Sequence, residues 1–220
     1  MRRKILISFS LLFLVTGCEI LSPFKNKDSS TNEKTSSLDS EVSSSNNNQS
    51  SSQTDIIGQS KAFDFTNAFT GAGGIKVINK TTEFLTYLNT GGNYVSSIDV
   101  DESVTFQPYF TDSGEQLGLS LLVGTSSYGG TITFNFVNDI KGISFTLQGY
   151  HKCYSSTWNL DSNAHVDIEG HGYNLGSTDT SHAPARVNDS ITIDPAKKSI
   201  TFSNDSDHQR AFIHNLTIVY

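Results

Sequence analysis

The sequence is poor in charge, in sulfur and in basic clusters. Charged residues make up 17% of its 220 residues, and it holds one Met, one Trp and two Cys. Typical globular domains carry ~25% charged residues. Because the net charge is -7 and no basic cluster is present, we expect no nucleic-acid partner. The 17 Gly and 14 Phe favour an all-β, exported protein over a helix-rich cytosolic enzyme.

Catalytic motifs are also missing. The chain has no Gly-x-Ser-x-Gly, no His-Glu-x-x-His and no phosphate-binding loop. Cys153 and the nearby His151 are a nucleophile and a base by type, but a lone Cys near a strand end is usually a small core residue. Sixteen carboxylates follow residue 56, which leaves a glycosidase pair open. We predict that the chain is not an enzyme, with a glycan-active hydrolase as the less favoured alternative.

Metal-binding patterns are equally sparse. His151 and Cys153 are followed by His165, His171 and His182, but no pair has a spacing diagnostic of zinc. Asp99, Asp101 and Glu102 supply oxygen ligands suited to calcium, yet the glycine-punctuated loop of a calcium site is absent. We therefore expect no cofactor and interpret both groups as solvated surface residues, with structural calcium as the alternative.

The N-terminus carries a targeting pattern. Residues 1–4 form a basic segment with two Arg and one Lys, and residues 5–15 form an apolar run of eleven residues broken only by two Ser, too short for a transmembrane helix of ~20 residues. The sequence Val-Thr-Gly-Cys then ends at Cys18 and resembles the lipobox of bacterial lipoproteins, although Val15 replaces the usual Leu. The resemblance implies a signal peptide at 1–17, palmitate or similar lipid on Cys18, and anchoring to the outer face of a bacterial cell membrane. The alternative is an ordinary secretory signal.

A polar segment separates this anchor from a single domain. Of the 26 residues 29–54, 20 are Ser, Thr, Asn or Gln, so this stretch cannot bury enough apolar surface to fold. We predict a disordered tether over 18–55 and a folded domain over 56–220. With Cys18 lipidated, Cys153 is the last thiol, so the domain must fold without an intramolecular disulfide.

Alternation with a period of two dominates the domain and predicts about nine short strands. Separate strands are expected at 131–136 and 143–147, and at 190–194 and 199–203 around a proline turn. Further strands are expected at 63–65, 94–100, 103–106, 118–123, 165–169 and 210–220. We predict an all-β, antiparallel β-sandwich of jelly-roll or galactose-binding-like topology, with an immunoglobulin-like sandwich second.

Two local features refine this prediction. Ile213 has the opposite parity to Leu216 and Ile218 in the last strand, which predicts a β-bulge near residues 214–215. One short helix is expected after a cap at Thr81 or Thr82, ending at Gly91 and Gly92.

The mid-domain hairpin and the closing strand carry a family resemblance. Residues 118–136 read GLSLLVGTSSYGGTITFNF, and the chain ends RAFIHNLTIVY. This pair resembles an uncharacterised β-sandwich module of bacterial surface proteins, found beside extracellular nucleases and glycan-degrading enzymes and similar to carbohydrate-binding jelly rolls. The resemblance covers residues 67–220 and implies a non-catalytic binding module.

Aromatic and polar side chains concentrate in residues 149–182. Sugars bind to flat aromatic faces with amides and carboxylates around them. The candidate ligand-binding residues are Tyr150, Tyr154, Trp158, Asp161 and Tyr173. In the competing interpretation, these aromatics plug the rim of the sandwich. We expect a glycan or another surface ligand, with a protein-protein interaction or adhesion scaffold as the alternative.

Overall fold

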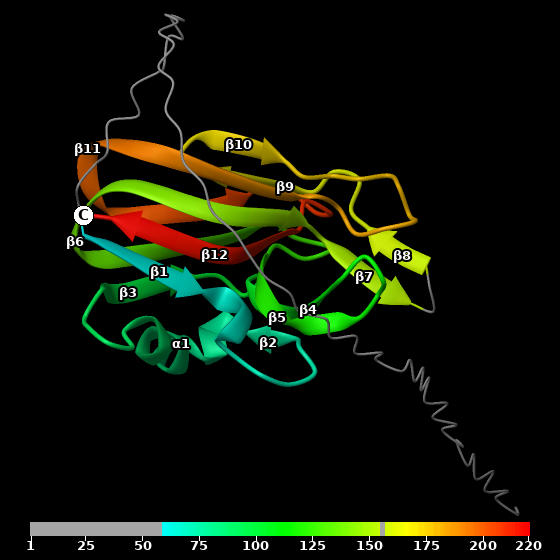
Figure 1. The fold of residues 1–220 in the computed structure, drawn as a ribbon, viewed down its shortest axis with the longest axis horizontal. Coiled ribbons are helices and arrows are strands. Elements are labelled where there is room, and N and C mark those ends of the chain that lie inside the picture. Colours follow the sequence, from blue (N-terminus) through cyan, green and yellow to red (C-terminus); the bar gives the residue numbers. More distant parts are fainter. Residues whose placement is uncertain (1–58, 155–156) are drawn as a thin grey trace, which may run out of the picture. The chain divides into compact units, whose positions relative to one another are not determined.

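The computed structural model describes residues 59–154 and 157–220. The predicted signal peptide, Cys18 and the tether lie outside the described residues. Ten strands form one hydrogen-bonded sheet system and two form a separate hairpin. The strands (Figure 1) are β1 (Ser60–Asp64), β2 (Ile75–Lys76), β3 (Val95–Val100), β4 (Thr105–Phe110), β5 (Gln116–Val123), β6 (Gly130–Gly149), β7 (His151–Tyr154), β8 (Thr157–Leu160), β9 (His165–Ile168), β10 (His171–Asn174), β11 (Arg186–Asn204) and β12 (Ala211–Val219).

Two long strands each contribute to two layers. The first half of β6 pairs with β3 and with the second half of β11, and β9 and β10 extend this layer. The second half of β6 pairs with β12 and with the first half of β11. β1, β5, β4 and β2 extend this second layer. All these pairings are antiparallel, which confirms the all-β antiparallel class.

The continuity of β6 and β11 corrects two predictions. The expected strands at 131–136 and 143–147 are parts of the single 20-residue strand β6. The expected turn after Asp194 is a bend inside the 19-residue strand β11, with register shifts between Thr192 and Ser199. These irregularities let one strand turn from the first layer to the second without ending.

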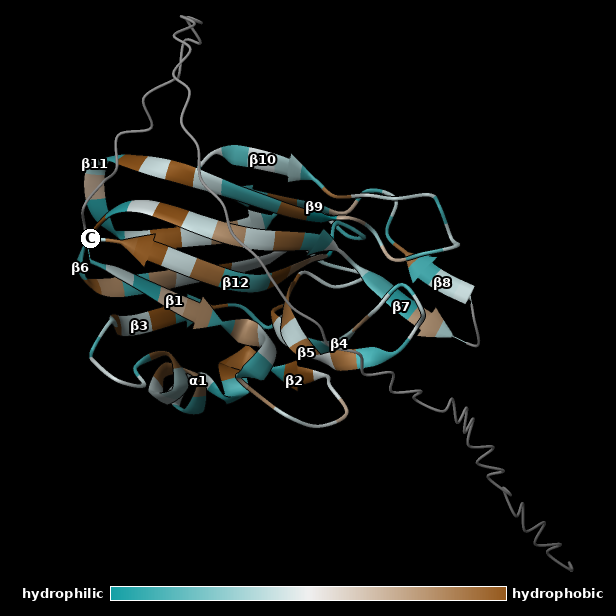
Figure 2. Cartoon of the chain, in the orientation of Figure 1, coloured by the Kyte–Doolittle hydropathy of each residue, from teal (hydrophilic) through white to brown (hydrophobic). Residues whose placement is uncertain are grey.

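Aromatic side chains fill the space between the layers. Phe145 and Phe202 lie in different layers, with ring centroids 6.3 Å apart, and Phe65 stacks on Phe134 at 5.6 Å. The alternation read from the sequence is visible as brown and pale or teal bands along β6, β11 and β12 (Figure 2). One face of each strand therefore builds a shared core, consistent with the predicted β-sandwich.

The one α-helix of the described residues, α1 (Thr81–Leu88), covers part of this core, after two short 3-10 turns, η1 (Phe65–Asn67) and η2 (Val77–Asn79). Phe84 and Leu88 are its buried residues. The expected cap was wrong, because the N-cap is Lys80 and the Thr81 hydroxyl donates to the carbonyls of Val77 and Ile78. No helix among the described residues has the length and apolar character needed to cross a membrane.

The bulge predicted in β12 is present. Its register shifts between Ile213 and Asn215, and Ile213, Leu216 and Ile218 are all fully buried. The extra residue turns His214 to the opposite face of the second layer, where it contacts Tyr109. The bulge therefore both completes the core and places a histidine outside it.

The folded domain has two distinct ends. Ser60 pairs with Val219, and the Tyr220 amide donates to the Gln59 carbonyl, so β1 starts beside the C-terminus. This β1 end lies at the left of Figure 1. The opposite end, here named the loop end, holds the β7–β8 hairpin (Figure 1). There the end of β6 pairs with the starts of β11 and β12, Gln148 with Arg186 and Gly149 with Ala211.

Candidate functional site

A groove of about 660 Å³ opens at the loop end. The segment between β4 and β5 forms one side and the segment leading into β11 forms the other. The lining side chains that matter below are those of Phe110, Asp112, Leu117, Gln148, His182 and Arg186. A cavity of this size falls in the ~300–1,000 Å³ range of small-ligand sites.

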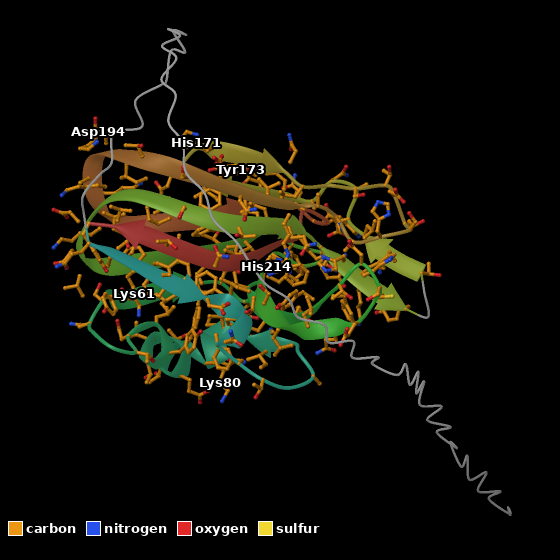
Figure 3. All side chains as sticks on the ribbon, viewed as in Figure 1. Lys61, Lys80, His171, Tyr173, Asp194 and His214 are labelled. Carbon is orange, nitrogen blue, oxygen red and sulfur yellow. The ribbon has the colours of Figure 1, made fainter. Side chains whose placement is uncertain are left out.

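A buried polar relay forms the base of this groove. The Gln148 side-chain amide donates to the Pro184 carbonyl at 2.6 Å, and its oxygen accepts from His214 Nε2 at 2.9 Å. Burial, followed by the charge of Arg186, lowers the pKa of His214 to about 3. His214 is therefore neutral, with its proton on Nε2, and its buried Nδ1 has no hydrogen-bond partner among the described residues. Figure 3 shows His214 on β12.

Aromatic packing supports the groove wall from behind. Trp158 is 5% exposed and lies 6.3 Å from the Phe110 ring and 5.8 Å from the His151 ring. His151 Nδ1 donates to the Gly149 carbonyl, and Nε2 accepts from the Phe110 amide. Burial lowers the pKa of His151. Both its nitrogens are thus occupied, so His151 is not free to act as a base for Cys153 or as a metal ligand.

Arg186 and Asp112 are the groove's unpaired charges. The Arg186 guanidinium lies 5.7 Å from the centroid of the Tyr109 ring, and Tyr109 is a residue of β4. Neither side chain forms an ion pair with any described residue. The groove therefore offers a cation, a carboxylate and apolar walls to one ligand.

The predicted ligand-binding residues do not share one surface. Asp161 is buried and accepts two hydrogen bonds from Arg210, at 2.5 and 2.6 Å. The same guanidinium lies 3.5 Å from the centroid of Tyr150, which stacks on Phe212. Tyr150 and Asp161 thus hold the loop end together, and Trp158 plugs its rim as the competing interpretation expected.

The remaining two candidates lie elsewhere. Tyr154 is 53% exposed, with the Lys152 ammonium 4.7 Å from its ring centroid. Tyr173 lies on β10, packs against Phe145 and donates to Asp189 at 2.9 Å (Figure 3). Burial, followed by the bond to Asp189, raises the pKa of Tyr173 to about 12. Of the predicted residues, Tyr154 alone is largely exposed, and Lys152 covers one face of its ring.

The acidic residues considered for calcium are engaged in turns and pairs. The Asp101 carboxylate accepts from the amides of Ser103 and Thr131, and Asp99 accepts from Asn135. Glu102 pairs with Lys76. The part of the chain that the structure describes holds no group of three or more His, Cys, Asp or Glu positioned for a metal ion.

Sequence reasoning missed Arg186 and Gln148. Arg186 follows a short Ala-Pro-Ala segment and is one of two arginines after residue 56. That rarity in an acidic domain was a usable signal. Gln148 had none, because its role depends on a histidine 66 positions away.

Comparison with known proteins gives no assignment. No protein-family model matches the chain, and no curated protein is significantly similar to it. Function must therefore be argued from the groove and from the N-terminal motif.

Proposed function

We propose that this chain is a lipid-anchored protein on the outer face of a bacterial cell membrane, and that its β-sandwich binds an extracellular glycan without catalysis. The observation that carries the binding role is the groove at the loop end, with its unpaired Asp112 and Arg186. The anchoring role is supported by the lipobox-like sequence ending at Cys18.

The groove chemistry suits a sugar. A pyranose ring has apolar C–H faces and a rim of hydroxyls, so its sites combine apolar walls with a few polar groups. Phe110 and Leu117 supply apolar surface, while Asp112 accepts and Arg186 donates hydrogen bonds. A lipid site would not need both charges, and a nucleic acid would be repelled by the acidic domain.

The same lining argues for binding without hydrolysis. Glycosidases use two carboxyl groups about 5–9.5 Å apart across the scissile bond. Asp112 is the single carboxylate among the described residues that line the groove. His182, the one lining histidine, has Nε2 3.3 Å from the Asp179 carboxylate and Nδ1 2.7 Å from the Ser181 hydroxyl, so both its ring nitrogens are already engaged by neighbours in the sequence. The arrangement therefore supports recognition more than acid-base chemistry.

The position of the groove fits a tethered protein. The predicted tether joins the domain before β1, at the end opposite the groove. As a flexible coil, the 41 residues 19–59 would have an r.m.s. span of roughly 35 Å. A coil of that span would let the domain reach a glycan layer beyond the membrane surface.

Binding is testable with the full chain in detergent micelles on an array of neutral and acidic glycans. Emission of Trp158, the single tryptophan, reports groove occupancy because it contacts Phe110. We expect Arg186→Ala to weaken the best array ligand at least ~10-fold, the equivalent of ~1.4 kcal/mol. The matched control is Lys198→Ala, an exposed cation beside the bend in the middle of β11. Absence of any array ligand, or equal losses in both variants, overturns the proposal.

Anchoring has its own test. Labelled palmitate should enter the chain expressed in a bacterial host, and Cys18→Ser should abolish the label and release the protein from the membrane fraction. Label in the Cys18→Ser variant, or none in the wild type, would overturn the anchor.

A further inference from the structure

A second, more polar pocket lies at the loop end. Its volume is about 540 Å³, and it is enclosed by the loop before β9, the end of β10 and the turn between β11 and β12. Its polar lining residues are Ser162, Asn163, His165, Asn174, Asp205 and Gln209. None of the residues lining this polar pocket lines the groove.

Buried hydrogen bonds fix the walls of the polar pocket. Asn204 is 4% exposed, and its oxygen accepts from the Gly130 amide at 2.6 Å. Its side-chain nitrogen lies 2.9 Å from the Val123 carbonyl and 2.7 Å from the Gln209 carbonyl. The His165 amide also donates to the Gln209 carbonyl. The strand ends around the pocket are therefore held before any ligand arrives, which lowers the entropic cost of binding.

The lining retains hydrogen-bonding capacity of both kinds. His165 Nδ1 donates to the Asn174 side-chain oxygen at 3.0 Å, which leaves His165 Nε2 as an acceptor and the Asn174 amino group as a donor. The Gln209 oxygen accepts from the Asp205 amide, which leaves the Gln209 amino group as a donor. The Asp205 carboxylate makes no hydrogen bond or ion pair with described residues. Donors and acceptors thus surround one small volume.

This chemistry selects among ligand classes. No Lys or Arg lines the polar pocket, so an anion would meet Asp205 without a counter-charge. Ala164 is its one apolar lining side chain, so a lipid tail or aromatic ring would gain little. A single carboxylate is also a poor cage for a divalent cation. Vicinal hydroxyls, each donating and accepting, satisfy the lining best.

The polar pocket and the groove are neighbours along the chain. Gly176 lines the polar pocket and the next residue, Ser177, lines the groove. A Cβ on Gly176 would lie 1.9 Å from the Ser162 carbonyl oxygen, so this glycine allows the segment between the two hollows to lie against the loop before β9. A ligand longer than one sugar would meet both hollows across this segment.

We propose that the polar pocket is a second binding site for a neutral sugar unit, and that one oligosaccharide occupies the pocket and the groove together. The proposal rests on the proposed function for its ligand class. Linked binding of two units raises affinity by about 10²–10⁴ over either unit alone, through effective concentration.

The test uses the full chain in detergent micelles with named probes. These are glucose, galactose, mannose and N-acetylglucosamine, with the hexasaccharide of each. Asp205→Ala disables the polar pocket, and Asp207→Ala is its control, because Asp207 is an exposed residue of the same turn outside the pocket lining. Arg186→Ala disables the groove. Amide NMR shifts of Asn163 and Gly176 report the pocket, and Trp158 emission reports the groove.

For at least one sugar, we expect hexasaccharide affinity at least ~100-fold above that of the monosaccharide. Asp205→Ala and Arg186→Ala should each remove most of that gain, and Asp207→Ala none. If Asp205→Ala leaves hexasaccharide binding and the Asn163 shifts unchanged while Arg186→Ala abolishes binding, the second site is wrong and the proposed function stands. If a sugar changes the amide shifts of Asn163 and Gly176 without changing Trp158 emission, linked binding and the groove's role as a sugar site are both wrong. If no sugar changes either the amide shifts or Trp158 emission, the polar pocket is not a sugar-binding site.

Discussion

The inter-layer core and the loop end of this domain are stabilised in opposite ways. The inter-layer core is apolar and rich in phenylalanine, with Phe65, Phe84, Phe134 and Phe202 packed ring against ring. The loop end buries polar groups instead, and each has a specific partner. These groups are Gln148, His151, Asp161, Asn204, Arg210 and His214.

This difference indicates which region of the domain can hold a binding site. An apolar core gains free energy from any well-packed hydrophobic side chain. A buried polar network is stable only while every member keeps its partner, so it holds groups in one geometry. Both candidate hollows lie at the loop end, where the polar network fixes their walls.

The largest effect is expected in the core. Phe134 contacts Phe65, Phe84 and Phe202, so Phe134→Ala should lower the free energy of unfolding by ~3–5 kcal/mol. Urea denaturation followed by Trp158 emission measures this loss. Tyr128→Ala is the control, since Tyr128 is 71% exposed and should change stability by less than ~0.5 kcal/mol. A loss below ~1 kcal/mol for Phe134→Ala would contradict the packed core.

The next effect tests the loop end. Arg210→Met leaves the buried Asp161 carboxylate without its guanidinium, which should cost ~3 kcal/mol. Adding Asp161→Leu should recover most of that loss, because no buried charge then remains unpaired.

Hydrogen exchange distinguishes the two regions in this variant. The His165 amide, bonded to the Gln209 carbonyl, should exchange much faster in Arg210→Met, while amides of the β6–β11 ladder should change only by the global loss. Uniform acceleration across both regions would show that the loop end is not a separate unit of stability.

The buried His214 of the loop end should also make the stability of the domain depend on pH. The pKa of His214 falls from 6.5 to about 3 in the folded state. Between these pH values, His214 is protonated in the unfolded chain and neutral in the folded chain. This contribution to stability is complete above pH 6.5 and is lost as the pH falls toward 3. Between pH 6.5 and 5 the loss should be about 2 kcal/mol, and the lowered pKa of His151 acts in the same direction.

Urea midpoints at pH 7.5, 6.5 and 5 measure this slope. His214→Gln keeps an N–H donor for Gln148 but cannot titrate, so it should flatten the profile by the share that His214 contributes. A wild-type profile that is level across this range would contradict a neutral, buried His214.

The smallest effect is expected at the surface. Lys76 and Glu102 pair at 3.2 Å, with side chains 47% and 78% exposed. Solvent screens such a pair, so Glu102→Gln should change the free energy of unfolding by less than ~1 kcal/mol. This change should disappear in high salt. A larger change would place this turn among the structural networks of the loop end.

The regular strands were accessible to prediction because their signal is local. Alternation located the strand segments of β3, β6, β11 and β12, and opposite parities in β12 predicted a bulge near residues 214–215, which the structure has between Ile213 and Asn215. The same alternation was blind to the continuity of β6 and β11, because a bend within a strand and a turn between strands share polar residues. The hairpin of β7 and β8 was missed, because residues 149–182 were interpreted as a region of ligand-binding loops.

The all-β class, a short helix near residue 81 and the face that each regular strand buries were predictable, because these follow from residue type and spacing between near neighbours. Tertiary structure alone decided which polar residues meet. It sealed Trp158 and Asp161 inside, paired Asp161 with Arg210, and left Arg186 and Asp112 unpaired at the groove. Such contacts join positions tens of residues apart, and neither spacing nor composition encodes the layer packing that brings them together.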